Sequence, residues 1–111
     1  MSALYAVTVE MSPAVEATWV QWMESTRIPE MLREPGFIGA RLWKETVGAE
    51  DGWVRYVCHF ELEELEAVER YVHSEAAQRM RAEGQQRFGK ELRISRSVFT
   101  EIVRFVGGGV T

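Results

Sequence analysis

Three side chains that can transfer or hold a proton lie in the middle of the sequence. Tyr56 and His59 fall in the apolar run WVRYVCHFEL, and Tyr71 lies in the segment that follows it. A histidine titrates close to neutral pH, and a tyrosine hydroxyl can orient a carbonyl or a phenol by hydrogen bonding. We therefore treat His59, Tyr56 and Tyr71 as candidate catalytic residues. Cys58 lies between them, and its sequence context is typical of a small buried hydrophobic residue.

A second group of side chains has the types expected of a binding pocket. In the stretch TWVQWMESTRIPEML, the spacing of Trp19, Trp22 and Met23 places all three on one face of a helix. Such a stripe most often packs in a hydrophobic core. The alternative is an apolar wall of a small-molecule pocket.

Arg27 follows this stripe and precedes Pro29. Its guanidinium group keeps its charge at ordinary pH, so it can hold an anion or an oxyanion but cannot act as a general base. A solvated arginine, or one that pairs with a helix dipole, is the alternative. Arg41 and His59 form a candidate polar cluster, and alternation leaves open whether it faces a cavity or a dimer interface. The candidate substrate-binding residues are Trp19, Trp22, Met23, Arg27 and Arg41.

The sequence has neither a metal-binding signature nor a phosphate-binding loop. The two histidines, His59 and His73, have no ligand spacing to each other or to a carboxylate. The segment RAEGQQRFGKELR carries glycines and basic residues, but it lacks the order of strand, Gly-rich loop and helix that binds phosphate. We therefore expect no metal and no cofactor.

Length and composition indicate one globular domain over residues 1–106, followed by a flexible tail at 107–111. The 111 residues are 46% hydrophobic and 27% charged, and the net charge of −4 gives nucleic acid no basic patch to bind. The first residues, MSALYAVTVE, resemble neither a signal peptide nor a membrane span. A single cysteine suits a reducing compartment, so we expect a cytoplasmic protein without a membrane partner.

Hydrophobic periodicity predicts the elements that must position these side chains. Alternation predicts strands over residues 3–10, 37–46, 53–62 and 92–105, with VGAEDGW as a hairpin turn. Ser12 and Pro13 mark the start of a first helix, which Pro29 is expected to end at Ile28 before a short second segment. A further helix is predicted over residues 62–73, with a Ser74-capped segment that runs to about residue 82 and a loop over 84–89.

The order strand, helix, strand, strand, helix, strand predicts an α+β, ferredoxin-like fold with an antiparallel four-stranded sheet and both helices on one face. Both faces of the predicted strands are partly apolar. Trp43 and Val57, for example, fall on the face opposite Leu42 and Cys58. An apolar second face needs a cover, and a second copy of the chain can supply it. We therefore expect a homodimer.

The segments LYAVTV, WVQWMESTRIPEML, PGF, ERYV and RAEGQQRFG resemble a bacterial family of unknown function. This family falls in the dimeric α+β barrel superfamily, with the antibiotic-biosynthesis monooxygenases and the stress-responsive barrel proteins. The resemblance implies two protomers packed sheet to sheet, each with a small-molecule cavity between sheet and helices. Where the family pattern has a histidine before "IP", this chain has Arg27, which argues against an acid–base role at that position.

Two functions remain open at this stage. The first is a cofactor-independent monooxygenase, or a cyclase or isomerase, that acts on a hydrophobic aromatic or polyketide-like compound. In this case Trp19, Trp22 and Tyr56 hold the ring, Arg27 or Arg41 stabilises an enolate, and His59 or Tyr71 moves a proton. The second is a non-catalytic ligand-binding, sensor or accessory barrel protein. Convergence of His59, Tyr56 and Tyr71 on one cavity favours chemistry, and their dispersal favours binding.

Overall fold

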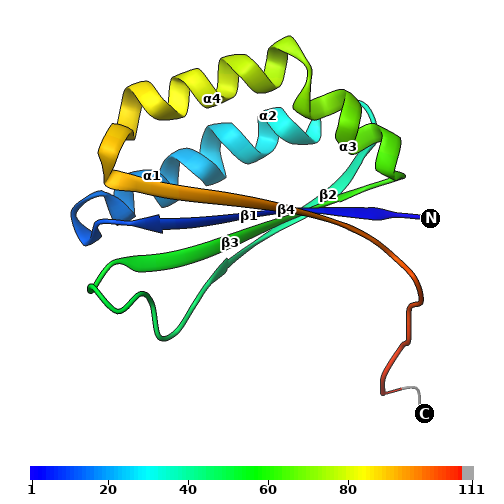
Figure 1. Ribbon diagram of the computed structural model, residues 1–111, viewed down its shortest axis with the longest axis horizontal. Helices are drawn as coiled ribbons and strands as arrows, with labels where there is room; N and C mark the ends of the chain where they lie inside the picture. The colour runs from blue at the N-terminus through cyan, green and yellow to red at the C-terminus, as the bar shows by residue number, and fades with distance from the viewer. Residues whose placement is uncertain (109–111) are drawn as a thin grey trace.

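The computed structural model describes residues 1–108 and contains a four-stranded antiparallel sheet (Figure 1). The strands are β1 (Ala3–Met11), β2 (Phe37–Lys44), β3 (Val54–Leu62) and β4 (Leu92–Thr100). They lie in the order β2-β3-β1-β4, so the first and third strands are central. Helical regions follow β1 and β3 and cover the same face of the sheet. The predicted ferredoxin-like α+β fold is confirmed.

The first helical region runs from a 3-10 turn, Pro13–Val15, into α1 (Glu16–Trp22), a π-turn (Met23–Arg27) and α2 (Ile28–Leu32). The Ser12 side chain caps its start by accepting a hydrogen bond from the amide of Ala14, at 3.3 Å. The predicted short second segment is present as α2, but the expected break before Pro29 is wrong, because the chain stays helical through the π-turn. Proline has no N–H and crowds the turn before it, and the wider π-turn accommodates both effects. In this turn the amide of Ile28 bonds to the carbonyl oxygen of Met23.

The second helical region consists of α3 (Leu65–Val72) and α4 (Glu75–Phe88). Ser74 caps α4 by accepting a hydrogen bond from the amide of Ala77, at 3.1 Å. The predicted loop over 84–89 is wrong, since Gly84 lies inside α4, which ends at Phe88 and is capped by Gly89 with a positive φ of 51°. A Cβ atom on Gly84 would stand 3.7 Å from the ring of Trp22, so this glycine lies at a helix-to-helix contact rather than in a turn.

The hydrophobic core fills the space between the sheet and the helices. On the central strands it contains Tyr5 and Phe60, which are register partners and lie on the helix side. An irregularity in β2 between Phe37 and Gly39 turns Phe37 to the same side, where its ring packs at 5.8 Å from Phe60 and 5.1 Å from Tyr71. Strict alternation would put Phe37 on the same face as Trp43, and the bulge places it on the opposite one.

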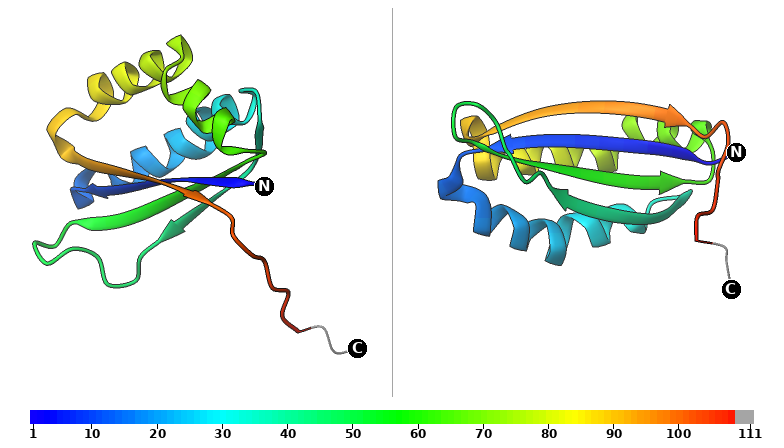
Figure 2. Two further views of the ribbon diagram at one scale, coloured as in Figure 1. Left: turned by 45° about the vertical axis from the view of Figure 1, so that its right-hand side comes forward. Right: turned by 90° about the horizontal axis from the view of Figure 1, so that it is seen from below.

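The other face of the sheet is covered by no helix in the described part of the chain, as the view from below shows (Figure 2). By register this face carries Leu4 and Ala6 on β1, Val57 on β3 and Phe99 on β4, among polar residues. Trp43 on β2 and Phe99 are 48% and 52% exposed. Apolar side chains from all four strands thus lie on one open face of the sheet, a pattern that is common at interaction surfaces.

The last strand is shorter than expected, because β4 ends at Thr100 and residues 101–108 have no regular structure. The amide of Glu101 still bonds to the carbonyl of Ser2, at 3.0 Å, and the chain then leaves the sheet (Figure 1). The predicted tail, 107–111, lies partly outside the described residues. None of the described helices is long and apolar enough to cross a membrane.

Candidate functional site

A cavity of about 290 Å³ lies between the sheet and the helices. Its walls come from the inner faces of β1 and β4, from the first helical region and from α4. Such a cavity lies near the lower end of the range, about 300–1,000 Å³, that is usual for small-molecule sites. Five of the eight candidate residues line it: Trp19, Trp22, Met23, Arg27 and Tyr71.

The two tryptophans are fixed by packing on different partners. Trp19 is fully buried, and its ring lies 5.2 Å from that of Tyr56 on β3. Trp22 packs at 5.5 Å from Phe88, the last residue of α4. These contacts join the first helical region to the sheet on one side and to α4 on the other. Both rings therefore belong to the core and to the cavity wall at once, and the two predicted roles of the aromatic stripe do not exclude each other.

Arg27 points inward from the last position of the π-turn. Its guanidinium carbon lies 5.5 Å from the centre of the Trp22 ring, in cation–π contact. The Nη1 atom is buried and has no hydrogen-bond partner among residues 1–108. Burial lowers the pKa of Arg27 below its ordinary value, and the charge of Arg96 lowers it further. The nearby Tyr71, Tyr5 and Glu83 act in the opposite direction.

The cavity lining also contains two arginines that were not predicted from the sequence, Arg81 on α4 and Arg96 on β4. Arg96 pairs with Val7 in the register of β1 and β4, so it lies on the helix side of the sheet. The signal was present in the sequence, because Ile94 and Val98 flank Arg96 at a spacing of two, and a charged residue within an apolar stripe is unusual. No comparable signal identifies Arg81, which lies on a largely polar helix.

Tyr71 on α3 reaches the cavity with its ring. Its hydroxyl donates a weak hydrogen bond to the sulfur of Met80, at 3.4 Å. Burial raises the pKa of this hydroxyl, while the charge of Arg27 lowers it. Tyr71 is therefore a neutral hydrogen-bonding group at physiological pH, next to a positive charge.

Tyr56 is not part of the cavity lining. Its hydroxyl donates a hydrogen bond of 2.7 Å to Glu16 on α1, and Lys44 on β2 pairs with the same carboxylate oxygen at 2.6 Å. Burial and this hydrogen bond raise the pKa of Tyr56 to about 12. Lys44, followed by the tyrosine, holds the pKa of Glu16 below its ordinary value. These contacts join α1 to β2 and β3, so Tyr56 has a structural role.

His59 and Arg41 lie on the uncovered face of the sheet and do not line the inner cavity. They line a shallow groove of about 560 Å³ together with Leu4, Trp43 and Phe99. The His59 ring lies 6.4 Å from that of Trp43, and the Arg41 guanidinium lies 5.8 Å from it. The sheet itself separates this groove from the inner cavity. A single small ligand cannot contact His59 and Tyr71 within one protomer.

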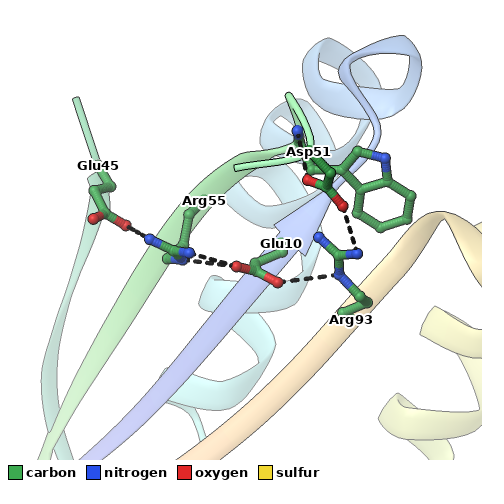
Figure 3. Close-up of polar contacts among 6 residues, drawn as sticks. Glu10, Glu45, Asp51, Arg55 and Arg93 are labelled. Atoms are coloured by element: carbon green, nitrogen blue, oxygen red, sulfur yellow. Dashed lines mark hydrogen bonds and ion pairs between the residues drawn. The ribbon is translucent and has the colours of Figure 1, made fainter. Parts of the chain in front are cut away.

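The same face carries a row of alternating charges near the hairpin between β2 and β3 (Figure 3). Glu45 pairs with Arg55, which binds Glu10 at 2.6 and 2.9 Å, and Glu10 binds Arg93 at 3.1 Å. Arg93 also binds Asp51 at 2.8 Å, and holds the pKa of that carboxyl below its ordinary value. Because each guanidinium has carboxylate partners within the row, these charges are structural and do not extend the cavity.

Neither metal nor thiol chemistry has a visible basis in the described residues. Residues 1–108 bring together no group of three or more side chains of the metal-ligating types. Cys58 is only 1% exposed, and burial raises the pKa of its thiol to about 12, with a smaller opposing effect of Arg27. A nucleophilic thiolate is therefore disfavoured at this position.

Comparison with known families identifies this architecture. The model of a domain of unknown function, DUF4286, matches residues 2–102. The chain belongs to the DUF4286 family. The matched region contains every residue that lines the inner cavity. No curated protein matches the sequence of the chain.

Several solved structures share the fold of this DUF4286 protein. A candidate antibiotic biosynthesis monooxygenase from Bacillus cereus has a TM-score of 0.68 at 15% identity, over 95% of this chain and 97% of that one. A variant of SnoaB, a cofactor-independent oxygenase from Streptomyces nogalater, has a TM-score of 0.66 at 14% identity, over 93% and 95% of the two chains. HapK from Hahella chejuensis has a TM-score of 0.68 at 11% identity, over 98% and 100%. At these identities the likeness shows the fold alone.

Proposed function

We propose that this DUF4286 protein binds a small hydrophobic molecule, aromatic or polyketide-like, in the cavity between its sheet and helices. The observation that carries the proposal is the lining itself, which combines Trp19, Trp22 and Tyr71 with Arg27, whose Nη1 atom is buried. Concave sites with mostly apolar walls and a few fixed polar groups are the usual form of small-molecule sites. The cavity is formed within one chain, so binding does not depend on assembly.

The positions of the three proton-transfer candidates favour binding without catalysis. Tyr56 is engaged by Glu16, His59 lies behind the sheet, and Tyr71 alone of the three lines the cavity. General acid–base chemistry needs a group within hydrogen-bond distance of the reacting atom, with a pKa close to the working pH. Tyr71 has a raised pKa, and the arginines cannot act as bases near neutrality. A ligand carrier, a sensor or an accessory subunit fits this arrangement best.

A cofactor-independent oxygenase, or a cyclase or isomerase, is the second candidate. The similarity in fold to SnoaB and the presence of the Arg27 charge and the Tyr71 hydroxyl in one cavity favour it. In this case the substrate is an enolisable or phenolic compound that loses its proton to water. Arg27 stabilises the resulting anion, and dioxygen is the oxidant in the oxygenase reaction.

Binding of 1-naphthol, followed by tryptophan fluorescence, tests the main proposal. We expect a saturable change with one site per chain, because the probe lies against Trp19 and Trp22. Gly84→Leu should abolish it by filling the cavity next to Trp22, whereas Ala82→Leu, exposed on the same helix, should leave it unchanged. Binding that survives Gly84→Leu contradicts the proposed site. Oxygen uptake with the same compound, absent in a carrier, separates the two candidate functions.

We also propose that the chain forms a homodimer through the uncovered face of its sheet. The support comes from the apolar residues on this face, Leu4, Ala6, Trp43, Val57 and Phe99, which a second sheet can cover. Such a dimer puts His59 and Arg41 at the interface rather than at a reaction centre. We keep the cytoplasm as the proposed location, since Cys58 is a free, buried thiol.

A further inference from the structure

The inner cavity contains two buried hydrogen-bond donors that have no acceptor among residues 1–108. They are Nη1 of Arg27 and the indole Nε1 of Trp22. Buried donors are nearly always paired in folded proteins, because an unpaired donor loses its bond to water and gains nothing in return. Both groups belong to side chains that line the same cavity and contact each other, with the guanidinium carbon 5.5 Å from the ring centre. A ligand that fits here must therefore supply acceptors.

The charge of the lining adds a second, independent requirement. Arg27, Arg81 and Arg96 line the cavity, and no aspartate or glutamate is among the lining residues in the part of the chain that the structure describes. Arg81 is partly engaged, since its Nη2 atom donates to the carbonyl of Val72 at 3.3 Å. By contrast, Arg55 and Arg93, the arginines of the charged row on the uncovered face of the sheet, each have carboxylate partners. A cavity of low polarity with uncompensated positive charge stabilises an anion.

We propose that the ligand is a small aromatic monocarboxylate. Its two carboxylate oxygens accept hydrogen bonds from Arg27 and from the indole N–H of Trp22, and Arg96 supplies a second positive charge nearby. Its ring lies against apolar residues of the lining such as Trp19, Phe60 and Val9. This assignment rests on the proposed function and names the ligand class of the same cavity.

The size and shape of the lining restrict the ligand further. A cavity of about 290 Å³ has room for an acid with one or two fused rings. A larger polyanion is disfavoured, because the apolar residues of the lining cannot hydrate further charges. Charge-assisted hydrogen bonds are about twice as strong as neutral ones, so a neutral amide of the same shape should bind more weakly.

The test compares 1-naphthoate with 1-naphthamide by calorimetric titration at pH 7.5. These two probes have nearly the same shape, and they differ in the charge and in the acceptors of one group. For the wild-type chain we expect the carboxylate to bind at least about tenfold more tightly than the amide. Arg27→Gln should abolish this preference for the carboxylate. Arg96→Gln should reduce the preference, and it leaves the first helical region unchanged because Arg96 lies on β4.

Two further variants separate specific contacts from general effects. Trp22→Phe keeps an aromatic ring but removes the indole N–H, so it should weaken naphthoate by several fold and leave the amide less affected. Arg79→Gln removes one charge from an exposed site on α4 and should leave both affinities unchanged. If Arg79→Gln weakens naphthoate as much as Arg27→Gln does, the effect is one of net charge and the proposal is overturned.

The outcomes for the proposed function and for the ligand class are distinct. Equal affinity for the two compounds, with loss of both in Gly84→Leu, contradicts the carboxylate assignment and leaves the cavity as a binding site. Failure of naphthoate, naphthamide and 1-naphthol to bind contradicts both proposals. Tighter binding of the amide also overturns the assignment, because it shows that the arginines do not act on the ligand.

Discussion

The hydroxyl of Tyr56 lies 2.7 Å from the carboxylate of Glu16, and this contact ties the centre of the sheet to the start of the first helix. The same carboxylate accepts a bond from Lys44, so a single acidic group joins α1 to two strands. Both partners stabilise the ionised form of Glu16, and its pKa is lowered as a result. The tyrosine that sequence reasoning nominated for catalysis therefore has a clear structural role.

We expect Tyr56→Phe to destabilise the fold by about 1 kcal/mol at pH 7, because one hydrogen bond to a partly exposed charged group is lost. The ring and its contact with Trp19 remain. A carboxyl with a depressed pKa adds stability above its unfolded value and loses it as the pH falls through its folded value. The cost of the substitution should therefore shrink below about pH 4. Urea denaturation of the wild type and the variant at pH 7 and below about pH 4 measures the difference in the free energy of unfolding. An equal difference under the two conditions contradicts the contact with Glu16.

Regular patterns made most of the fold predictable, and local packing explains the errors. Alternation located all four strands, because apolar residues recur with a period of two in each, most clearly in the central strands β1 and β3, where many of them are buried. It failed at Phe37, where a bulge changes the face, and at Gly84, where a glycine serves a helix contact instead of a turn. At Pro29 the rule that proline ends a helix was too strict, since a π-turn accommodates it. These outcomes depend on neighbours that are distant in sequence.

Only the part of the candidate site that lies on the first helical region was predictable from the sequence. The stripe of Trp19, Trp22, Met23 and Arg27 could be found because the four residues share one helical segment. Arg81 and Arg96 face them from α4 and β4, and only the tertiary fold brings them to the same cavity. The faces of His59 and Arg41 depended on the register of β2 and β3, which alternation within one strand does not fix.

Val57→Glu should convert the proposed dimer into a folded monomer. Val57 lies on the uncovered face of β3, between Thr8 on β1 and Trp43 on β2, and a glutamate there would have to be desolvated in a sheet-to-sheet interface. Light scattering should give a mass of about twice 12.8 kDa for the wild-type chain and 12.8 kDa for the variant, with circular dichroism unchanged. Thr18→Glu, with the same charge on an exposed helix position, should remain dimeric. A monomeric wild-type chain at micromolar concentration contradicts the proposal.

Cys58 should react with a thiol reagent only when the protein unfolds. The side chain is fully buried, and burial raises the pKa of its thiol to about 12, so both access and thiolate are lacking at pH 8. We expect labelling in buffer to be at least about a thousandfold slower than in strong denaturant, as for a group released by unfolding. A Cys58→Val, Ala82→Cys variant provides an exposed thiol on α4 as the control. Rapid labelling of native Cys58 would show that the core opens locally.

Gly84→Ala and Gly36→Ala should change stability in opposite directions. Gly84 has ordinary helical geometry inside α4, and a Cβ there meets the Trp22 ring at 3.7 Å, a normal contact distance. Alanine is about 1 kcal/mol more favourable than glycine in a helix interior, so the melting temperature should rise by about 4 °C. Gly36 has a φ of 87°, and a Cβ on it would lie 2.6 Å from that of the buried Ala67.

For Gly36→Ala we expect a loss of about 2 kcal/mol or more, from the combination of strained backbone and steric overlap. Thermal unfolding of the two variants in parallel measures both changes in stability. The two variants are matched, since each adds a single methyl group to the chain. Destabilisation by Gly84→Ala would contradict this prediction, because it would mean that the added methyl group overlaps the Trp22 ring. A stabilised Gly84→Ala variant with weaker naphthoate binding would instead show that this glycine trades helix stability for room in the cavity, as its position against Trp22 implies.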